Sequence, residues 1–187
     1  MSNLSNALQL NAIHSQLPVT AYFDEALLKR EIDTLFKRGP RYIGHELMVP
    51  EAGSYFALPG EGEGRLLVRN KQDEIELLSN VCRHRQAIML NGRGTAENIV
   101  CPLHRWTYDL DGQLLGAPHF ADNPCLNLGK SRLQNWQGLL FESSGRDLAA
   151  DLAQLGPAKH FDFSGFMFDH VEVHECNYNW KIGRAHV

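Results

Sequence analysis

The first strong hydrophobic pattern along the chain has the period of an α-helix. Between Leu27 and Phe36, aliphatic and aromatic residues recur three or four positions apart, with polar residues between them. Asp24 stands before this run as an N-cap, and a Gly-Pro pair follows it as a stop signal. The pattern predicts an amphipathic helix over Asp24–Arg38 whose apolar face packs on the body of the protein.

Beyond the helix the pattern changes to short strands separated by turns. Arg65–Asn70 and Glu74–Ser79 flank a short polar loop, which predicts a hairpin. A second hairpin is predicted where Asp111-Gly112, a tight-turn signal, separates Trp106–Leu110 from Gln113–Leu115. Several short strands at this spacing are typical of a mainly antiparallel β domain. With the N-terminal helix, the expected fold class is mainly β, and α+β overall.

Three further segments follow the hairpins. The Gly-Leu-Leu-Phe run in Gln137–Glu142 predicts a strand buried on both faces, and Asp147–Leu155 predicts a short helix that ends at a Gly-Pro pair. Phe166–His174 then alternates in the manner of a strand. These features divide the chain into an N-terminal arm and helix (1–39), a β domain (40–145), and a linker that begins a further unit (146–181).

Composition and charge narrow the possible partners. The 187 residues carry 18 Lys and Arg against 22 Asp and Glu, a net charge of −4, and no basic run exceeds two residues. The sequence therefore lacks the basic clusters that bind nucleic acids or anionic membranes. No stretch approaches the roughly 18 apolar residues of a membrane span, and residues 1–19 lack a signal-peptide pattern, so we expect a cytoplasmic protein.

Two short motifs combine cysteine with histidine at metal-ligand spacing. One residue separates Cys82 from His84, two separate Cys101 from His104, and sixteen lie between the motifs. In a Rieske [2Fe–2S] centre two cysteines bind one iron and two histidines bind the other, and the imidazoles make the cluster easier to reduce than an all-cysteine one. These four residues are therefore the candidate ligands of one Rieske-type cluster.

Two other interpretations use the same four residues. A structural zinc site also takes two cysteines and two histidines, but zinc fingers usually pair like with like, whereas each loop here mixes the two types. Coincidence among scattered core residues would leave the doubled motif unexplained. The pattern favours the iron–sulfur cluster, with a structural zinc module as a remote alternative.

The remaining cysteines and histidines form weaker patterns. Cys125 and Cys176 have no partner at metal spacing and are predicted to be buried thiols. His170 and His174, near Asp169, have a spacing that suits metal binding on a helix, but the alternation around them predicts a strand edge instead. We therefore assign no ligand or catalytic role to these residues.

Two aromatic residues and one arginine adjoin the motifs. Trp106 and Tyr108 follow the second motif, where they either cover a cluster and donate hydrogen bonds or form the aromatic core of the hairpin. Arg85 either tunes the potential of a cluster or pairs with a surface carboxylate. Both roles stay open at the level of sequence.

The residues around the motifs resemble the Rieske domain in the alpha subunit of ring-hydroxylating-type non-haem iron oxygenases. The matching segments are Ser79–Arg85 and Cys101–Gly112, together with the N-terminal helix, the Gly-Leu-Leu-Phe run and Asn179-Trp180-Lys181. The resemblance extends from about residue 20 to residue 181. It implies the same four cluster ligands that the spacing suggests.

This sequence departs from the family pattern at a few positions. Gln86 stands where a glycine commonly follows the first ligand loop, and Leu103 and Arg105 replace a frequent tyrosine and glycine. High-potential respiratory Rieske proteins carry an extra, disulfide-bonded cysteine in each loop, and the equivalent positions here are Ala87 and Leu103. The resemblance therefore implies a low-potential, soluble cluster.

The resemblance also implies an electron-transfer role within a larger enzyme. A reductase or ferredoxin passes NAD(P)H-derived electrons to the cluster, which serves a mononuclear Fe(II) that hydroxylates an aromatic or amine substrate with O₂. In that family a cluster histidine, His84 or His104 here, faces a neighbouring alpha subunit. A stand-alone Rieske ferredoxin is the main alternative, although a minimal carrier needs neither the N-terminal helix nor the residues after the β domain.

The end of the chain fits the same expectation. In the family, the domain that holds the mononuclear iron begins near the Asn-Trp-Lys segment, and here the sequence ends six residues later. We therefore expect a fragment that binds a cluster but is not catalytically competent alone. Residues 182–187 match a common sequencing-library adapter read in this frame, and we expect them not to belong to the natural protein.

Overall fold

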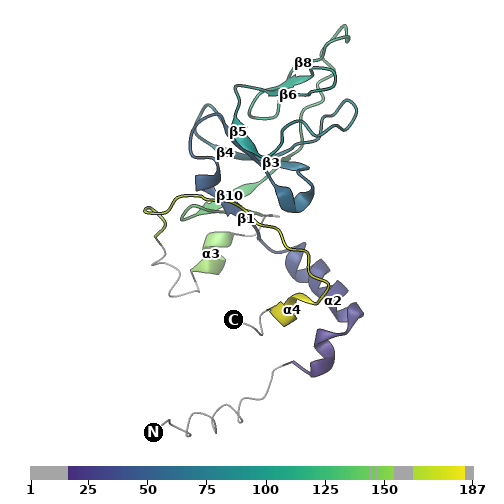
Figure 1. Cartoon of the computed structure of the whole chain (residues 1–187), viewed down its shortest axis with the longest axis vertical. Helices are drawn as coiled ribbons and strands as arrows, with labels where there is room; N and C mark the ends of the chain where they lie inside the picture. Colours follow the sequence, from purple (N-terminus) through teal and green to yellow (C-terminus); the bar gives the residue numbers. More distant parts are fainter. Residues whose placement is uncertain (1–16, 144, 146, 154–161, 184–187) are drawn as a thin grey trace. The chain divides into compact units, whose positions relative to one another are not determined.

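The chain forms two compact units, one made of residues 1–38 and 175–187 and the other of residues 39–174. The computed structural model describes residues 17–143, 145, 147–153 and 162–183, and Figure 1 colours them along the sequence. Antiparallel strands make up most of the regular structure of the second, larger unit. The predicted fold class, mainly β with an N-terminal helix, is therefore confirmed.

The smaller unit is helical in its described part. Its elements are η1 (Val19–Tyr22), α2 (Glu25–Glu31), the π-helical turn η2 (Ile32–Phe36) and α4 (Trp180–Gly183). Asp24 caps α2, because its carboxylate accepts a hydrogen bond from the Leu27 N–H at 3.0 Å. The start of the predicted helix is thus confirmed, but full burial of its apolar face is not observed, since Leu35 and Phe36 are 57% and 47% exposed.

Glu31 joins the two sequence segments of the smaller unit. Its carboxylate accepts hydrogen bonds from the Trp180 indole, at 3.2 Å, and from the ammonium group of Lys181. Trp180 also packs edge-on against Phe36, with ring centroids 5.4 Å apart. The hydrogen bond from Lys181 lowers the pKa of Glu31 below its usual value. An ion pair and an aromatic contact therefore hold the end of α2 against α4.

The described residues of the larger unit form three antiparallel sheets, and Figure 1 labels several of their strands. The first sheet has the order β1 (Arg41–His45), β11 (Leu139–Glu142), β10 (Leu133–Trp136). The second has the order β5 (Arg93–Thr95), β2 (Ser54–Ala57), β3 (Arg65–Arg69), β4 (Ile75–Ser79), β9 (Lys130–Ser131). The third has the order β6 (Ile99–Val100), β7 (Thr107–Tyr108), β8 (Leu114–Gly116). Three short helical elements complete the unit: η3 (Glu46–Met48), η4 (Pro59–Glu61) and α3 (Leu148–Leu152).

Both predicted hairpins are confirmed. β3 pairs with β4 in antiparallel register, with Arg65 opposite Ser79. β7 pairs with β8 across the predicted turn, where Gly112 has a φ of 83°, a left-handed conformation that glycine adopts without strain. The carboxylate of Asp109 closes this turn by accepting a hydrogen bond from the Asp111 N–H at 3.0 Å.

The core of the larger unit lies on both faces of the second sheet. β3 shows this division, because Leu66 and Val68 belong to one group of buried side chains and Leu67 to another. Successive side chains of a strand point to opposite faces, so one strand can serve both groups. The first group also contains Cys82 and Cys101. The candidate ligands are therefore anchored in the core by their cysteines.

The predicted burial of Gln137–Glu142 on both faces is wrong. The strand begins at Leu139, and of its residues only Leu140 is buried. Phe141, which points to the opposite side, packs against the exposed ring of Tyr42 with centroids 5.6 Å apart. One face of the first sheet is therefore covered by the core, and the other face is only partly covered.

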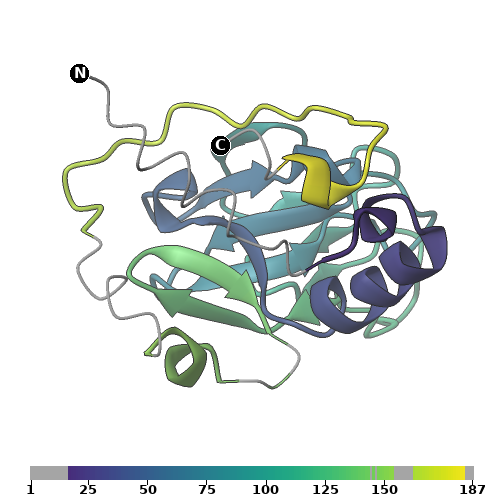
Figure 2. The same cartoon turned by 90° about the horizontal axis from the view of Figure 1, so that it is seen from below.

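Two later predictions have different outcomes. α3 lies within the short helix predicted over Asp147–Leu155, and Asp147 caps its start. Figure 2 shows α3 beside the β10–β11 hairpin, where the Leu148 N–H donates to the Gln134 side chain at 2.8 Å. The Gly-Pro pair at 156–157 lies outside the described residues. The strand predicted over Phe166–His174 is wrong, because this segment pairs with no described strand and alternation alone supplies no hydrogen-bond partners.

Candidate functional site

Two loops of the larger unit bring the four candidate ligands together. Cys82 and His84 lie just after β4, and Cys101 and His104 lie between β6 and β7. The two imidazole rings have centroids 4.7 Å apart and planes inclined by 69°. Both cysteine side chains are buried in the same core group and form no disulfide. The fold thus joins two motifs that sixteen residues separate in sequence.

The two ligand loops have the same backbone hydrogen bonds. In each loop the cysteine N–H donates to the carbonyl five residues later, and the N–H four residues after the cysteine donates back to the cysteine carbonyl. The four bonds are Cys82 to Ala87 (2.9 Å), Gln86 to Cys82 (3.0 Å), Cys101 to Trp106 (2.8 Å) and Arg105 to Cys101 (3.1 Å). The two loops therefore share one backbone hydrogen-bond pattern, although the spacing between cysteine and histidine differs between the two motifs.

The residue that closes each loop has a left-handed backbone. The φ angle is 57° at Gln86 and 60° at Arg105. This conformation costs a residue with a β-carbon about 1–2 kcal/mol, whereas glycine adopts it freely. Both positions are those at which the family pattern commonly has glycine. The structure gives the physical reason for that preference and shows that this chain uses side-chain-bearing residues there.

Each candidate histidine has one buried ring nitrogen without a partner. The Nδ1 atoms of His84 and His104 are inaccessible to solvent and make no hydrogen bond within the described part of the chain. Leaving such an atom unsatisfied costs about 1–3 kcal/mol, a cost that a metal–nitrogen bond removes. Burial and the nearby charges of His104 and Arg85 lower the pKa of His84, which favours the neutral imidazole that binds metals. Two buried thiols and two free imidazole nitrogens fit the donor set of a Rieske cluster.

His45 also has a buried ring nitrogen, Nε2, without a partner. Its surroundings differ, because its Nδ1 accepts the Leu47 N–H at 3.1 Å and its ring packs edge-on against Phe163, 5.2 Å away. Among the described residues, no cysteine accompanies it in a metal-binding group. His45 is therefore a capping residue of η3 rather than part of the candidate site.

Trp106 and Tyr108 are at once core residues and neighbours of the candidate ligands. The Trp106 ring is 1% exposed and stacks on His84, with centroids 4.9 Å apart and planes 6° from parallel. The Tyr108 hydroxyl lies 3.7 Å from Cys82 Sγ and accepts the Arg83 N–H at 3.2 Å. Burial raises the pKa of Tyr108, so its hydroxyl keeps its proton. Tyr108 thus combines the two roles considered for these aromatics. Toward the described residues Trp106 acts by packing, because its indole nitrogen is buried without a hydrogen-bond partner among them.

Two residues near the site were not singled out by the sequence analysis. Phe120 packs edge-on against Trp106 and His84, with centroid distances of 5.2 and 5.9 Å. Asn80 is fully buried and ties down the chain before the first loop, since its amide donates to the Leu90 carbonyl at 2.6 Å. Phe120 is remote from both motifs in sequence, so only the fold could assign its place. Asn80 lies inside the segment that resembles the family.

The weaker candidates are not brought to this site. Cys125 and Cys176 are exposed, so the prediction that they are buried thiols is wrong. Both lie in segments without regular structure, which the core does not cover. His170 and His174 are exposed and contact the carboxylates of their own sequence neighbours, Asp169 and Glu172. Local side-chain pairs satisfy these histidines without a metal.

A second group of potential metal ligands lies elsewhere in the larger unit. Oxygen atoms of Glu74, Glu76 and Asp111 lie within 4.8 Å of one another, and we call this group the acidic corner. The Asn70 amide donates to Asp111 at 2.8 Å, and Lys130 forms an ion pair with Glu76 at 2.6 Å. The protein itself therefore supplies partners for the acidic corner.

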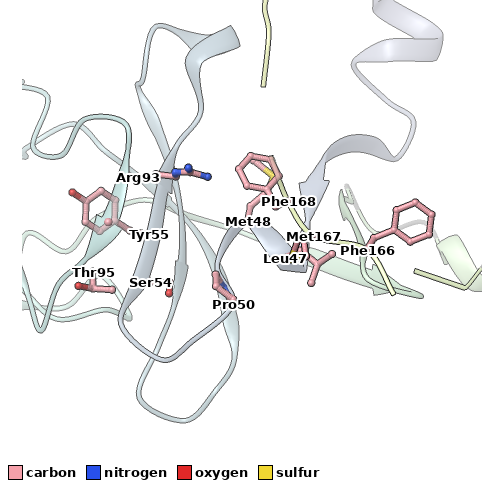
Figure 3. Close-up of a pocket in the computed structure, with 11 residues that line it drawn as sticks. Leu47, Met48, Pro50, Ser54, Tyr55, Arg93, Thr95, Phe166, Met167 and Phe168 are labelled. Atoms are coloured by element: carbon pink, nitrogen blue, oxygen red, sulfur yellow. The ribbon is translucent and has the colours of Figure 1, made fainter. Parts of the chain in front are cut away.

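An apolar groove of the larger unit is separate from the ligand loops. Figure 3 shows this groove, of about 580 Å³, with Phe168 and Met48 on one side and Arg93 and Tyr55 on another. No candidate cluster ligand and no carboxylate lines it. Within the described residues, no helix has the length and apolar character required to cross a membrane. The ligand loops thus remain the site with distinctive chemistry.

Comparison with known proteins agrees with this geometry. The family model described as the Rieske [2Fe-2S] domain matches residues 40–135, a range that includes both ligand loops. The chain belongs to the Rieske [2Fe–2S] domain family. The four candidate ligands and the predicted β domain all fall within this range or at its edge.

Two enzymes that share one name, and one dioxygenase of known structure, are among the proteins similar to this Rieske chain. Putrescine 2-hydroxylase of Ralstonia nicotianae is 68% identical over 181 residues, which cover 97% of this chain and 49% of that protein. Putrescine 2-hydroxylase of Bordetella bronchiseptica is 49% identical, over 97% of this chain and 45% of that protein. The naphthalene 1,2-dioxygenase of a Rhodococcus species has a TM-score of 0.64 at 25% identity, over 83% of this chain and 39% of that chain. The chain thus spans about half the length of the curated relatives it matches.

Proposed function

We propose that Cys82, His84, Cys101 and His104 hold one [2Fe–2S] cluster. The observation that carries this proposal is the pair of buried Nδ1 atoms, without a partner among the described residues, beside two buried thiols. When bound, a cluster of this kind takes up and releases single electrons. The chain's own residues bury the thiols, favour the neutral imidazole of His84 by lowering its pKa, and hold the two loops in one framework.

We further propose that this domain serves a larger oxygenase. High identity to the two putrescine hydroxylases supports hydroxylation of an organic substrate, and short diamines are the first class to test. In such a protein, residues 146–181 lead into a second domain with a mononuclear Fe(II) site, and a reductase or ferredoxin supplies electrons. Neighbouring alpha subunits complete the assembly.

Anaerobic purification of the chain tests the cluster. We expect two iron and two acid-labile sulfide per chain, visible absorption that bleaches with dithionite, and a Rieske-type EPR signal in the reduced state. Stoichiometric zinc without absorption or an EPR signal would show that the site is a structural zinc module.

Sequencing of the source gene beyond the codon of Lys181 tests the oxygenase. We expect the frame to continue into a domain with two histidines and a carboxylate in a facial-triad arrangement. The complete protein, given a reductase, NADH, O₂ and putrescine, should then yield a product heavier by one oxygen atom. A stop codon directly after the Asn-Trp-Lys segment would instead identify a stand-alone electron carrier.

A further inference from the structure

Most of the buried side-chain atoms without a hydrogen-bond partner lie in one aromatic group. Among the described residues these atoms are Nε2 of His45, Nδ1 of His84, Nδ1 of His104 and Nε1 of Trp106. The last three belong to side chains in contact, since His84 lies 4.7 Å from His104 and 4.9 Å from Trp106 between ring centroids. Two of the three are the nitrogens assigned to the cluster. The third, the indole nitrogen of Trp106, has no role in the proposed function.

The indole nitrogen differs from the imidazole nitrogens because it can only donate a hydrogen bond. It therefore does not bind iron, and it requires an acceptor. A buried donor without an acceptor costs about 1–3 kcal/mol, and the N–H of a buried tryptophan usually has a partner. Trp106 is only 1% exposed, so bulk water does not serve as that partner. An acceptor that the described residues do not supply is thus required beside Trp106.

This acceptor cannot come from the surface of another domain or subunit. The indole nitrogen is already inaccessible to solvent in the chain by itself, so a group that docks from outside does not reach it. Trp106 differs in this respect from exposed side chains, whose partners can belong to the rest of a longer protein. The acceptor must therefore lie inside the larger unit.

The contacts of Trp106 connect it to both ligand loops. Its carbonyl closes the second loop by accepting the Cys101 N–H at 2.8 Å, and its side chain belongs to the buried group that contains Cys82 and Cys101. The indole plane lies within 6° of the His84 plane, so the N–H runs parallel to the imidazole face and does not point at it. Phe120, its other ring contact, has no side-chain oxygen, nitrogen or sulfur atom that could accept. The cluster bound beside His84 is the remaining source of acceptors.

We propose that the indole N–H of Trp106 donates a hydrogen bond to a sulfur atom of the cluster held by the two ligand loops. Hydrogen bonds to the sulfur atoms are among the factors that set the potential of an iron–sulfur cluster. A donor stabilises the more negative, reduced state, so Trp106 raises the reduction potential. This inference rests on the proposed function.

The test measures the reduction potential of the anaerobically purified chain by redox titration followed by EPR. Trp106→Phe removes the N–H and keeps an aromatic ring. Phe120→Leu is the matched control, because it loosens the packing around the same indole without removing a donor. In Trp106→Phe the ratio of reduced to oxidised cluster at a given potential should fall about threefold to tenfold. This change corresponds to a potential lower by roughly 30–60 mV for one electron.

The sign of the shift separates a hydrogen bond from packing. Looser packing admits water, which stabilises the more negative, reduced cluster and raises the potential. Phe120→Leu should therefore leave the potential unchanged or raise it, whereas loss of the Trp106 N–H should lower it. A role in packing alone does not give a lower potential.

A second sample keeps the shape of the indole. The chain has three tryptophans, so position 106 is the only one left in the double variant Trp136→Phe/Trp180→Phe. Biosynthetic replacement of this tryptophan by β-(3-benzothienyl)alanine puts sulfur in place of the N–H and should lower the potential as Trp106→Phe does. The same double variant grown with ¹⁵N-labelled indole should show ¹⁵N coupling to the reduced cluster in pulsed EPR. This sample serves the comparison even where Trp106→Phe does not assemble a cluster.

Two results would overturn this inference while two iron and two sulfide per chain are retained. One is an unchanged or raised potential when position 106 carries the benzothienyl analogue. The other is absence of ¹⁵N coupling to the cluster, because the indole N–H would then serve a buried water molecule. Absence of iron and sulfide in the wild-type chain would instead refute the proposed function.

Discussion

Two places in the larger unit gather side chains that metals bind, and they differ in what surrounds those side chains. At the ligand loops, two imidazole nitrogens are buried without any partner among the described residues. At the acidic corner, carboxylates approach one another just as closely, but the Asn70 amide and the Lys130 ammonium group satisfy them.

This difference separates a cofactor site from a structural polar cluster. Buried polar atoms are almost always satisfied, so a group of ligating atoms that the protein leaves unsatisfied indicates something that binds there. Proximity alone does not make that distinction, because both groups are compact. The neighbours of the ligating atoms are therefore more informative than the atoms themselves.

The largest expected effect separates the two sites directly. Cys101→Ser should remove the cluster, with loss of stoichiometric iron and of visible absorption, because serine is a poor replacement for a thiolate ligand. Asp111→Asn, the matched change at the acidic corner, should leave iron content unchanged. Full iron content in Cys101→Ser would refute the ligand assignment.

A change at the acidic corner should affect stability without affecting the cluster. Asn70 is 1% exposed. Its side-chain oxygen, Oδ1, accepts hydrogen bonds from the backbone N–H groups of Gln72 and Glu74 at 3.0 and 2.8 Å. Asn70→Ala should lower the free energy of unfolding by about 1–3 kcal/mol, since two backbone N–H groups of the turn lose their acceptor and the Asp111 carboxylate loses a donor. Urea unfolding measures the loss, with exposed Lys71→Ala as the control. A shifted reduction potential in Asn70→Ala would mean that the two sites are coupled.

The hydroxyl of Tyr108 should tune the electron affinity of the cluster. A hydrogen bond to the Cys82 sulfur stabilises the more negative, reduced state, and Tyr108→Phe removes it. The potential should fall by up to about 60 mV, which corresponds to about 1.4 kcal/mol for one electron. A redox titration followed by EPR gives the value, with Tyr55→Phe as the control. An unchanged or raised potential would show that the hydroxyl does not act on the sulfur.

The smallest expected effect concerns the loop backbone. Gln86→Gly should raise the free energy of unfolding by roughly 0.5–1 kcal/mol, because relief of left-handed strain exceeds the entropy that glycine adds to the unfolded chain. Ala87→Gly in the same loop should lower it by a similar amount, since φ at Ala87 is not positive. The denaturant midpoints of the two variants measure these changes in stability. Equal midpoint shifts in both variants would show that the backbone of Gln86 is not strained.

Local features were predicted well from the sequence. The Asp24 cap, the short helix after Asp147 and the turn at Gly112 depend on hydrogen bonds and backbone angles within a few residues, so the sequence pattern carries them. Burial was predicted less well. The Phe166–His174 segment alternates but finds no strand to pair with, and Cys125 is exposed although cysteine is usually buried.

The proposed donor set could be predicted from the sequence alone, because two thiols and two imidazoles at C-x-H and C-x₂-H spacing are recognisable regardless of the fold. The stacking of Trp106 on His84, the packing of Phe120 against both rings and the burial of two Nδ1 atoms without partners among the described residues follow only from the three-dimensional fold. The physical reason is that ligand identity is a property of single side chains, whereas burial and pairing depend on contacts between residues far apart in the chain.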